Sequence, residues 1–141
     1  MRRPPNLLVF IPHDLGDYLG CYGHSDVASP HLDGLASEGV RFGHYFTAAP
    51  ECTPSRAGMY TGLYTHQNGL MGLCHRGWEF GEQAVHLAER LRTGGYRTRL
   101  FGLQHETHGD VRRLGYEEHR SADDRRAPAV CAAVERFLES E

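Results

Sequence analysis

The clearest chemical pattern in the chain lies between residues 49 and 56, where the sequence reads A-P-E-C-T-P-S-R. Pro54 favours the first turn of a helix, which places Cys52 just before the helix N-terminus. Free backbone N–H groups and the helix dipole at that point stabilise an anion or a thiolate. Arg56 in the first turn opposes the dipole unless an anion binds beside it. The pattern therefore predicts an oxyanion pocket, with a structural cysteine beside a surface arginine as the alternative.

Polar residues follow the two best strand candidates. Residues 7–11 form a short apolar run of the kind found in strands buried on both faces, and residues 98–101 form a second extended segment. The polar residues that follow are His13 and Asp14 in the first case and Gln104 and His105 in the second. Ligands of open α/β sheets bind beyond the carboxyl ends of the strands, so topology makes these residues site candidates. Ordinary polar loops are the alternative.

The remaining cysteines and histidines do not form a recognisable metal motif. The four cysteines are far apart and include no C-x-x-C pair. Among the ten histidines, His105 and His108 are close, but H-E-T-H lacks the spacing that puts two ligands on one helical face. A zinc site there is therefore disfavoured.

Helical and extended segments alternate along the chain. We expect helices over residues 30–38, 54–61, 82–92 and 128–140. Ser29 is a candidate cap for the first helix, Pro30 suits its first position, and Gly39 ends it. Residues 40–46 look extended, while residues 64–81 and 107–127 show no clean period and are predicted to be irregular. The alternation predicts an α/β fold with a layered sheet flanked by helices.

The composition excludes several classes of protein. The 141 residues suit one domain, and the formal charge of −3, with arginine as the only basic residue apart from histidine, gives no reason to expect a nucleic-acid or anionic-membrane partner. No apolar run approaches the ~18 residues of a membrane helix. The first residues lack a signal-peptide core, so the chain as written is expected to be soluble and cytoplasmic.

The segment that begins at Cys52 resembles the signature of a known protein family. Residues 52–62 match the sulfatase signature C-x-P-S-R-x-x-x-x-T-G at every fixed position. Further segments resemble the family in colinear order: residues 6–23, 29–36, 94–98 and 102–105. The sequence H-Q-N-G at residues 66–69 looks most like the heparan N-sulfatase (sulfamidase) branch. The resemblance implies the N-terminal portion of a formylglycine-dependent, alkaline-phosphatase-like fold.

The resemblance also implies a mechanism. A formylglycine-generating enzyme converts Cys52 to an aldehyde whose hydrate attacks the sulfur of a sulfated small molecule or sugar. Arg56 neutralises charge, His105 contacts substrate or moves a proton, and His66 lines the substrate pocket. A divalent cation, usually calcium in this family, is held by Asp14, by the residue at position 13, and by the group made from Cys52.

Three departures from the family pattern open alternatives. His13 replaces an aspartate metal ligand, Leu103 replaces a lysine, and the chain ends before the family's later metal ligands and second lysine. We therefore expect residues 1–141 to be a single, incomplete sulfatase domain without measurable turnover by itself. A truncated, non-catalytic relative and a phosphonate or phosphate ester hydrolase on the same fold are the alternatives.

Overall fold

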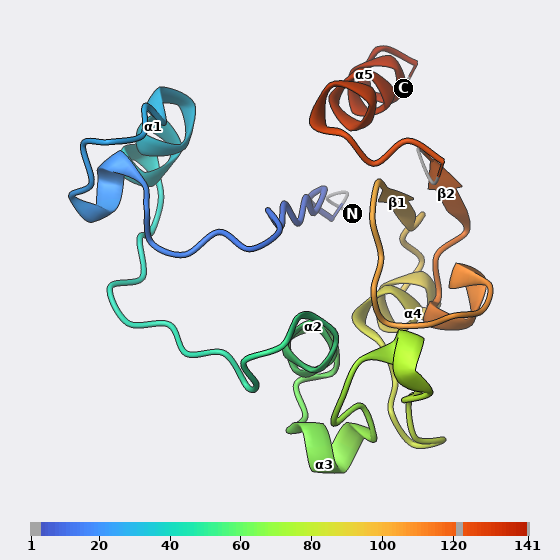
Figure 1. The fold of residues 1–141 in the computed structure, drawn as a ribbon. Helices are drawn as coiled ribbons and strands as arrows, with labels where there is room; N and C mark the ends of the chain where they lie inside the picture. The colour runs from blue at the N-terminus through green and yellow to red at the C-terminus, as the bar shows by residue number, and fades with distance from the viewer. Residues whose placement is uncertain (1–3, 121–122, 141) are drawn as a thin grey trace. The chain divides into compact units, whose positions relative to one another are not determined.

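The computed structural model describes residues 4–120 and 123–140, and contacts within it define two compact units, Met1–Phe46 and Thr47–Glu141. The elements in chain order, labelled in Figure 1 where space allows, are the 3-10 helix η1 (Gly20–Tyr22), α1 (Pro30–Glu38), α2 (Cys52–Thr61), α3 (Thr65–Asn68), the 3-10 helix η2 (Cys74–Arg76), α4 (Leu87–Thr93), β1 (Arg99–Phe101), the 3-10 helix η3 (Val111–Leu114), β2 (Glu118–Arg120) and α5 (Ala127–Glu139). The prediction of one domain over residues 1–141 concerns independent folding. The division into units does not test it, and it stays a prediction.

The N-terminal unit is organised around α1, whose predicted bounds are confirmed. Pro30 lies in the first turn, where its missing N–H costs nothing. Ser29 does not cap the helix as the sequence suggested. Its hydroxyl instead donates to Asp33 Oδ1 at 2.9 Å and accepts from the backbone N–H of Gly20 at 2.9 Å. Asp33 Oδ1 also accepts from Cys21 N–H at 2.7 Å, so the serine ties η1 to α1.

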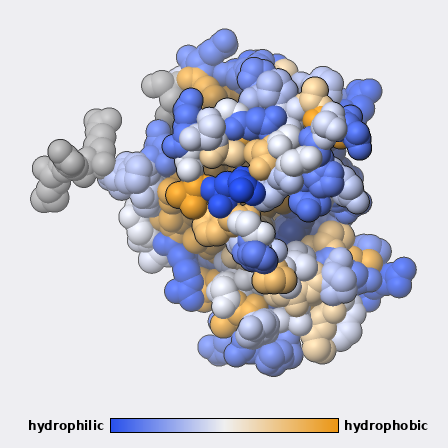
Figure 2. Space-filling model, turned by 90° about the vertical axis from the view of Figure 1, so that its left-hand side faces the viewer, coloured by the Kyte–Doolittle hydropathy of each residue, from blue (hydrophilic) through white to orange (hydrophobic). Residues whose placement is uncertain are grey.

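Two segments of this unit differ from their predicted structure. Residues 7–11 were expected to form a buried strand, but they are irregular, and Leu8 and Phe10 are 85% and 70% exposed. Residues 40–46 are likewise irregular and exposed. An apolar extended run becomes a strand only when neighbouring strands accept its hydrogen bonds, and within the described residues only β1 and β2 pair. Figure 2 shows apolar side chains among the polar ones on the surface that faces the viewer.

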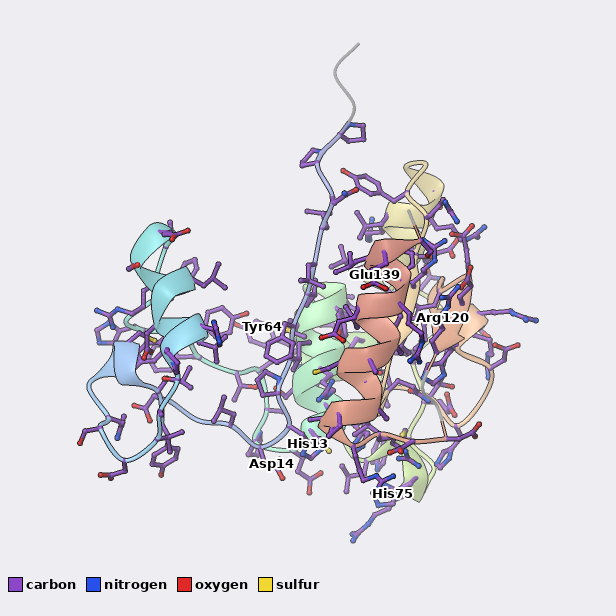
Figure 3. All side chains as sticks on the ribbon, turned by 90° about the horizontal axis from the view of Figure 1, so that it is seen from above. His13, Asp14, Tyr64, His75, Arg120 and Glu139 are labelled. Carbon is purple, nitrogen blue, oxygen red and sulfur yellow. The ribbon has the colours of Figure 1, made fainter. Side chains whose placement is uncertain are left out.

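The C-terminal unit contains a parallel pair of strands. β1 confirms the strand predicted at residues 98–101, and it pairs with β2 in the register Arg99↔Glu118 and Phe101↔Arg120. α5 confirms the last predicted helix and packs against β1. The Phe137 ring of α5 lies 5.6 Å from the ring of Phe101 and beneath the guanidinium groups of Arg99 and Arg120. Figure 3 labels Arg120 at the sheet beside this helix. Helices beside a small parallel sheet are consistent with the predicted α/β class.

The central helices are shorter or more broken than predicted. α4 begins at Leu87 rather than at residue 82, because His86 caps it by accepting the Ala88 N–H on Nδ1 at 3.1 Å. Residues 64–81 contain α3 and η2, and residues 107–127 contain η3 and β2, so both segments are more regular than expected.

The buried apolar residues among those described are Ala57, Leu70, Cys74, Ala88, Val111, Leu114 and Ala133. No helix within the described residues has both the length and the apolar character needed to cross a membrane.

Candidate active site

Cys52 is the first residue of α2, which begins two residues earlier than predicted. Glu51 is the N-cap residue and makes no side-chain capping hydrogen bond. Pro54, in the same first turn, carries no N–H, so Cys52 and Thr53 supply the free backbone donors there. The helix ends at Gly62, whose φ of 69° is the left-handed conformation that glycine adopts readily. The predicted helix is confirmed, with its start moved to Cys52.

The side chain of Cys52 lies against His105. Cys52 Sγ is 3.2 Å from His105 Nδ1, across a separation of 53 residues. The neighbouring residue strengthens the contact, because Thr53 Oγ1 donates to the main-chain oxygen of His105 at 2.7 Å. Thr53 is fully buried, and its hydroxyl also accepts from Cys74 N–H at 3.5 Å. The start of α2 therefore holds both the imidazole and the backbone of His105.

His105 belongs to a tight loop after β1. Gln104 shapes this loop, because its Oε1 accepts the N–H groups of Glu106 and Thr107 at 2.9 and 3.1 Å. The His105 N–H donates to Glu106 Oε2 at 3.0 Å. The predicted position beyond the carboxyl end of a strand thus brings His105 to Cys52, whereas the catalytic roles of both residues stay predictions.

Glu106 is a buried carboxyl group that the sequence analysis did not single out. It is 2% exposed, and its Oε1 has no hydrogen-bond partner among the described residues. Burial raises the pKa of Glu106, while its hydrogen bond from His105 N–H and the nearby Arg56 charge lower it. The available signal was its place beside His105 at the end of a strand, where charged residues tend to be functional.

Arg56 lies on the same side of this unit as Glu106 and two tyrosines. Its positive charge lowers the pKa values of Tyr60 and Tyr116, although burial outweighs it and both phenol pKa values are raised. Each phenol also influences the pKa of the other. Arg56 is half-buried, so its guanidinium interacts with protein groups and not only with solvent. The alternative of a surface arginine is therefore disfavoured.

The predicted metal ligands His13 and Asp14 lie together in the N-terminal unit. His13 Nδ1 is 3.1 Å from Asp14 Oδ1, and the two side chains are adjacent in Figure 3. Asp14 has a φ of 53°, a left-handed conformation that aspartate tolerates better than most residues. Cys52 belongs to the other unit, so the metal set of Asp14, His13 and Cys52 stays a prediction.

His66 and Leu103 occupy the remaining predicted positions. His66 lies in the short helix α3, which follows the end of α2 and packs against that helix. Its ring stacks on Tyr64 with centroids 6.0 Å apart. The substrate-binding role of His66 stays a prediction. Leu103 is half-buried in the loop that carries His105.

Comparisons with known proteins agree on one family. A family model described as Sulfatase matches residues 5–124. Steryl-sulfatase of Mus musculus is 41% identical over 112 residues, which are 73% of this chain and 18% of that protein. N-sulphoglucosamine sulphohydrolase of Homo sapiens is 39% identical over 105 residues, 73% of this chain and 21% of that protein. Arylsulfatase A of Homo sapiens is 38% identical over 111 residues, with shares of 74% and 22%. The chain spans about a fifth of the length of these relatives.

Proposed function

The chain belongs to the sulfatase family, and from that premise we propose that it carries the nucleophile and the proton-handling histidine of a sulfuric ester or sulfamate hydrolase. The observation that carries the proposal is the 3.2 Å contact between Cys52 Sγ and His105 Nδ1. Cys52 occupies the cysteine position of the family signature. His105, which lies 53 positions later and outside the signature, contacts it in the fold.

We propose that a formylglycine-generating enzyme converts Cys52 to formylglycine. An external oxidant supplied to that enzyme oxidises Cβ by two electrons, the Cβ–Sγ bond breaks, an oxygen takes the place of sulfur, and the sulfur leaves as hydrogen sulfide. The hydrated aldehyde supplies an oxygen nucleophile for sulfur. An oxygen that replaces Sγ on the Cys52 Cβ lies in the direction of His105 Nδ1. The imidazole is therefore placed to take a proton from that oxygen or to return one to the leaving alcohol or amine.

Arg56 supplies positive charge on the same helix. It lies one helical turn after Cys52, and residues four apart lie on the same face. The guanidinium can donate two parallel hydrogen bonds to sulfuryl oxygens, which gain charge as sulfur is attacked. Leucine occupies position 103, and the chain contains no lysine. We therefore assign the neutralisation of sulfuryl charge to Arg56.

The residues predicted to hold a divalent cation do not fit calcium. In the N-terminal unit, Asp14 offers a carboxylate, whereas His13 offers an imidazole nitrogen that already contacts that carboxylate. Calcium takes about six to eight oxygen ligands, and imidazole suits transition metals or zinc. We therefore assign no step of the reaction to a cation held by this pair.

The substrate class is proposed to be a sulfated small molecule, with an N-sulfated sugar ahead of simple aryl sulfates. Support comes from the H-Q-N-G sequence at residues 66–69 and from the similarity to N-sulphoglucosamine sulphohydrolase. Side-by-side turnover of sulfamate and aryl sulfate substrates by the longer protein tests this order. A clear preference for phosphonate monoesters would move the assignment to phosphonate or phosphate ester hydrolysis.

A non-catalytic relative of the sulfatases is the second candidate. Two observations favour it, namely Leu103 at the position where the family carries a lysine and the single carboxylate beside His13. Such a protein would keep an anion-binding site at Arg56 without turnover. Sulfate binding that depends on Arg56 and persists in Cys52→Ala, together with no turnover by converted protein, would establish this reading.

The nucleophile is tested by peptide mass spectrometry after co-expression with a formylglycine-generating enzyme. We expect conversion at Cys52 and none at Cys21, Cys74 or Cys131, which lack the Pro and Arg spacing of the signature. Cys52→Ala is the matched control, because it removes the thiol while leaving the helix intact. An unmodified thiol at Cys52 would refute the assignment.

A further inference from the structure

The loop that carries His105 contains one group whose placement the proposed function does not explain, the buried carboxyl of Glu106. We propose that Glu106 is a positioning residue that fixes the His105 imidazole against Cys52. Any effect of Glu106 on turnover rests on the proposed function. The positioning of His105 is a property of the chain with Cys52 unmodified and can be tested without turnover.

Glu106 and Thr53 together pair both main-chain polar groups of His105. The His105 N–H donates to Glu106 Oε2 at 3.0 Å, and the His105 carbonyl accepts from Thr53 Oγ1 at 2.7 Å. A residue whose N–H and C=O are both held by buried side chains has little freedom in its backbone angles. The imidazole then retains only its own side-chain torsions, and its contact with Cys52 Sγ restricts those as well.

The burial of this carboxyl is costly and therefore needs a compensating role. Glu106 is 2% exposed, and a buried carboxyl group with one oxygen left without a hydrogen bond loses solvation that the protein does not replace. An apolar side chain of similar size would fill the same space without that loss. What an apolar residue could not do is accept the His105 N–H.

The two carboxyl oxygens of Glu106 differ in their contacts. Oε2 accepts the His105 N–H, whereas Oε1 has no hydrogen-bond partner among the described residues. The hydrogen bond to His105 is therefore the contact through which Glu106 acts on the loop.

The test uses the full chain with Cys52 left as a thiol, so that it does not depend on conversion or turnover. Nuclear magnetic resonance reports two quantities for the wild type, Glu106→Gln and Glu106→Leu. These are the hydrogen-exchange rate of the His105 amide relative to that of Leu100 in β1, and the cross-relaxation peak between the Cys52 β protons and the His105 ring proton next to Nδ1.

The matched control is Glu117→Leu. Glu117 Oε2 accepts the Thr98 N–H at 2.8 Å, so this variant removes the same kind of carboxylate-to-amide bond elsewhere in the same unit. A general loss of stability would change the His105 measurements in both Glu106→Leu and Glu117→Leu. A positioning role of Glu106 would change them in Glu106→Leu alone.

In Glu106→Leu we expect the relative exchange of the His105 amide to accelerate about 10- to 100-fold, because the variant leaves a buried N–H without its acceptor. We also expect the Cys52–His105 peak to be lost. Glu106→Gln retains an acceptor oxygen and should restore the peak and most of the protection. Glu117→Leu should leave both quantities unchanged.

Three outcomes would overturn the proposal. The first is a hydrogen-exchange rate of the His105 amide in the wild type that equals the rate of an unstructured amide. This outcome can be measured without any variant. The second is an unchanged peak in Glu106→Leu. The third is equal loss of the peak in Glu106→Gln, Glu106→Leu and Glu117→Leu. Because no substrate is present, failure of the sulfatase assignment appears separately, as an unconverted Cys52 or absent turnover.

Discussion

Gly115→Ala should destabilise the C-terminal unit far more than a chemically identical change at Gly77. Both glycines follow 3-10 helices and adopt left-handed backbone angles, with φ of 97° at Gly115 and 91° at Gly77. They differ in their surroundings. A Cβ on Gly115 would collide with the backbone of Glu89 and lie 2.7 Å from the Ala88 carbonyl carbon, whereas a Cβ on Gly77 meets nothing within 4 Å.

The difference between the two variants isolates the steric contribution. Placing alanine in the left-handed region costs about 1–2 kcal/mol at either site. At Gly115, forcing η3 away from the backbone of α4 adds about 1–3 kcal/mol, because the obstructing atoms are main chain and cannot rotate aside. We therefore expect the free energy of unfolding to fall by about 2–5 kcal/mol in Gly115→Ala and by about 1–2 kcal/mol in Gly77→Ala.

Urea unfolding followed by circular dichroism measures both values, and the dependence on urea should keep its wild-type slope if two-state unfolding holds. Equal losses in the two variants would refute the close approach of η3 to α4.

Two other changes probe the same unit. Thr53→Val removes the hydroxyl that bonds the His105 carbonyl, and we expect a loss of about 1–3 kcal/mol in unfolding free energy together with a weaker Cys52–His105 cross-relaxation peak; an unchanged peak would contradict the assigned contact. Burial lowers the pKa of His86 to about 4, so the folded chain binds its proton less readily than the unfolded chain. The stability that His86 contributes is therefore present above about pH 6.5 and is lost as pH falls towards 4, by up to about 3 kcal/mol. Urea unfolding at pH 7 and pH 4.5 should show this loss in the wild type relative to His86→Asn, and identical pH dependence in both proteins would exclude it.

Local signals predicted some elements to the residue. α1 has Pro30 at its start and Gly39 after its end, and these residues act through their own backbone angles and hydrogen bonds, so its bounds could be predicted without knowledge of the fold. The start of α4 was wrong because the His86 side chain competes for a backbone N–H, a contact that helical periodicity does not reveal. The end of that helix at Gly94 was predictable for the same local reason as that of α1.

Features that depend on distant residues were predicted less well. The apolar run at residues 7–11 has the composition of a buried strand, but strand formation requires hydrogen-bond partners, which no local pattern guarantees. β2 is a short polar segment whose structure comes from pairing with β1, so nothing in its composition indicated a strand. The signature predicted Cys52 and Arg56 as site residues, and the place after a strand together with the family resemblance predicted His105. Glu106 was missed because its burial comes from tertiary packing, which no local pattern indicates.

The hydrogen bond from Thr53 to His105 also limits the time during synthesis in which the Cys52 segment is extended. If the modifying enzyme reads the Cys52 segment in extended form, it must act before α2 is locked, and a helix of ten residues is only marginally stable until tertiary contacts hold it. The contact that buries Thr53 comes from a residue 52 positions later in the chain. At about 5–20 residues per second, synthesis delivers that residue about 3–10 seconds after Thr53 itself. Under the proposed conversion of Cys52, modification competes with elongation, and we expect slower translation of the segment up to His105 to increase the aldehyde yield.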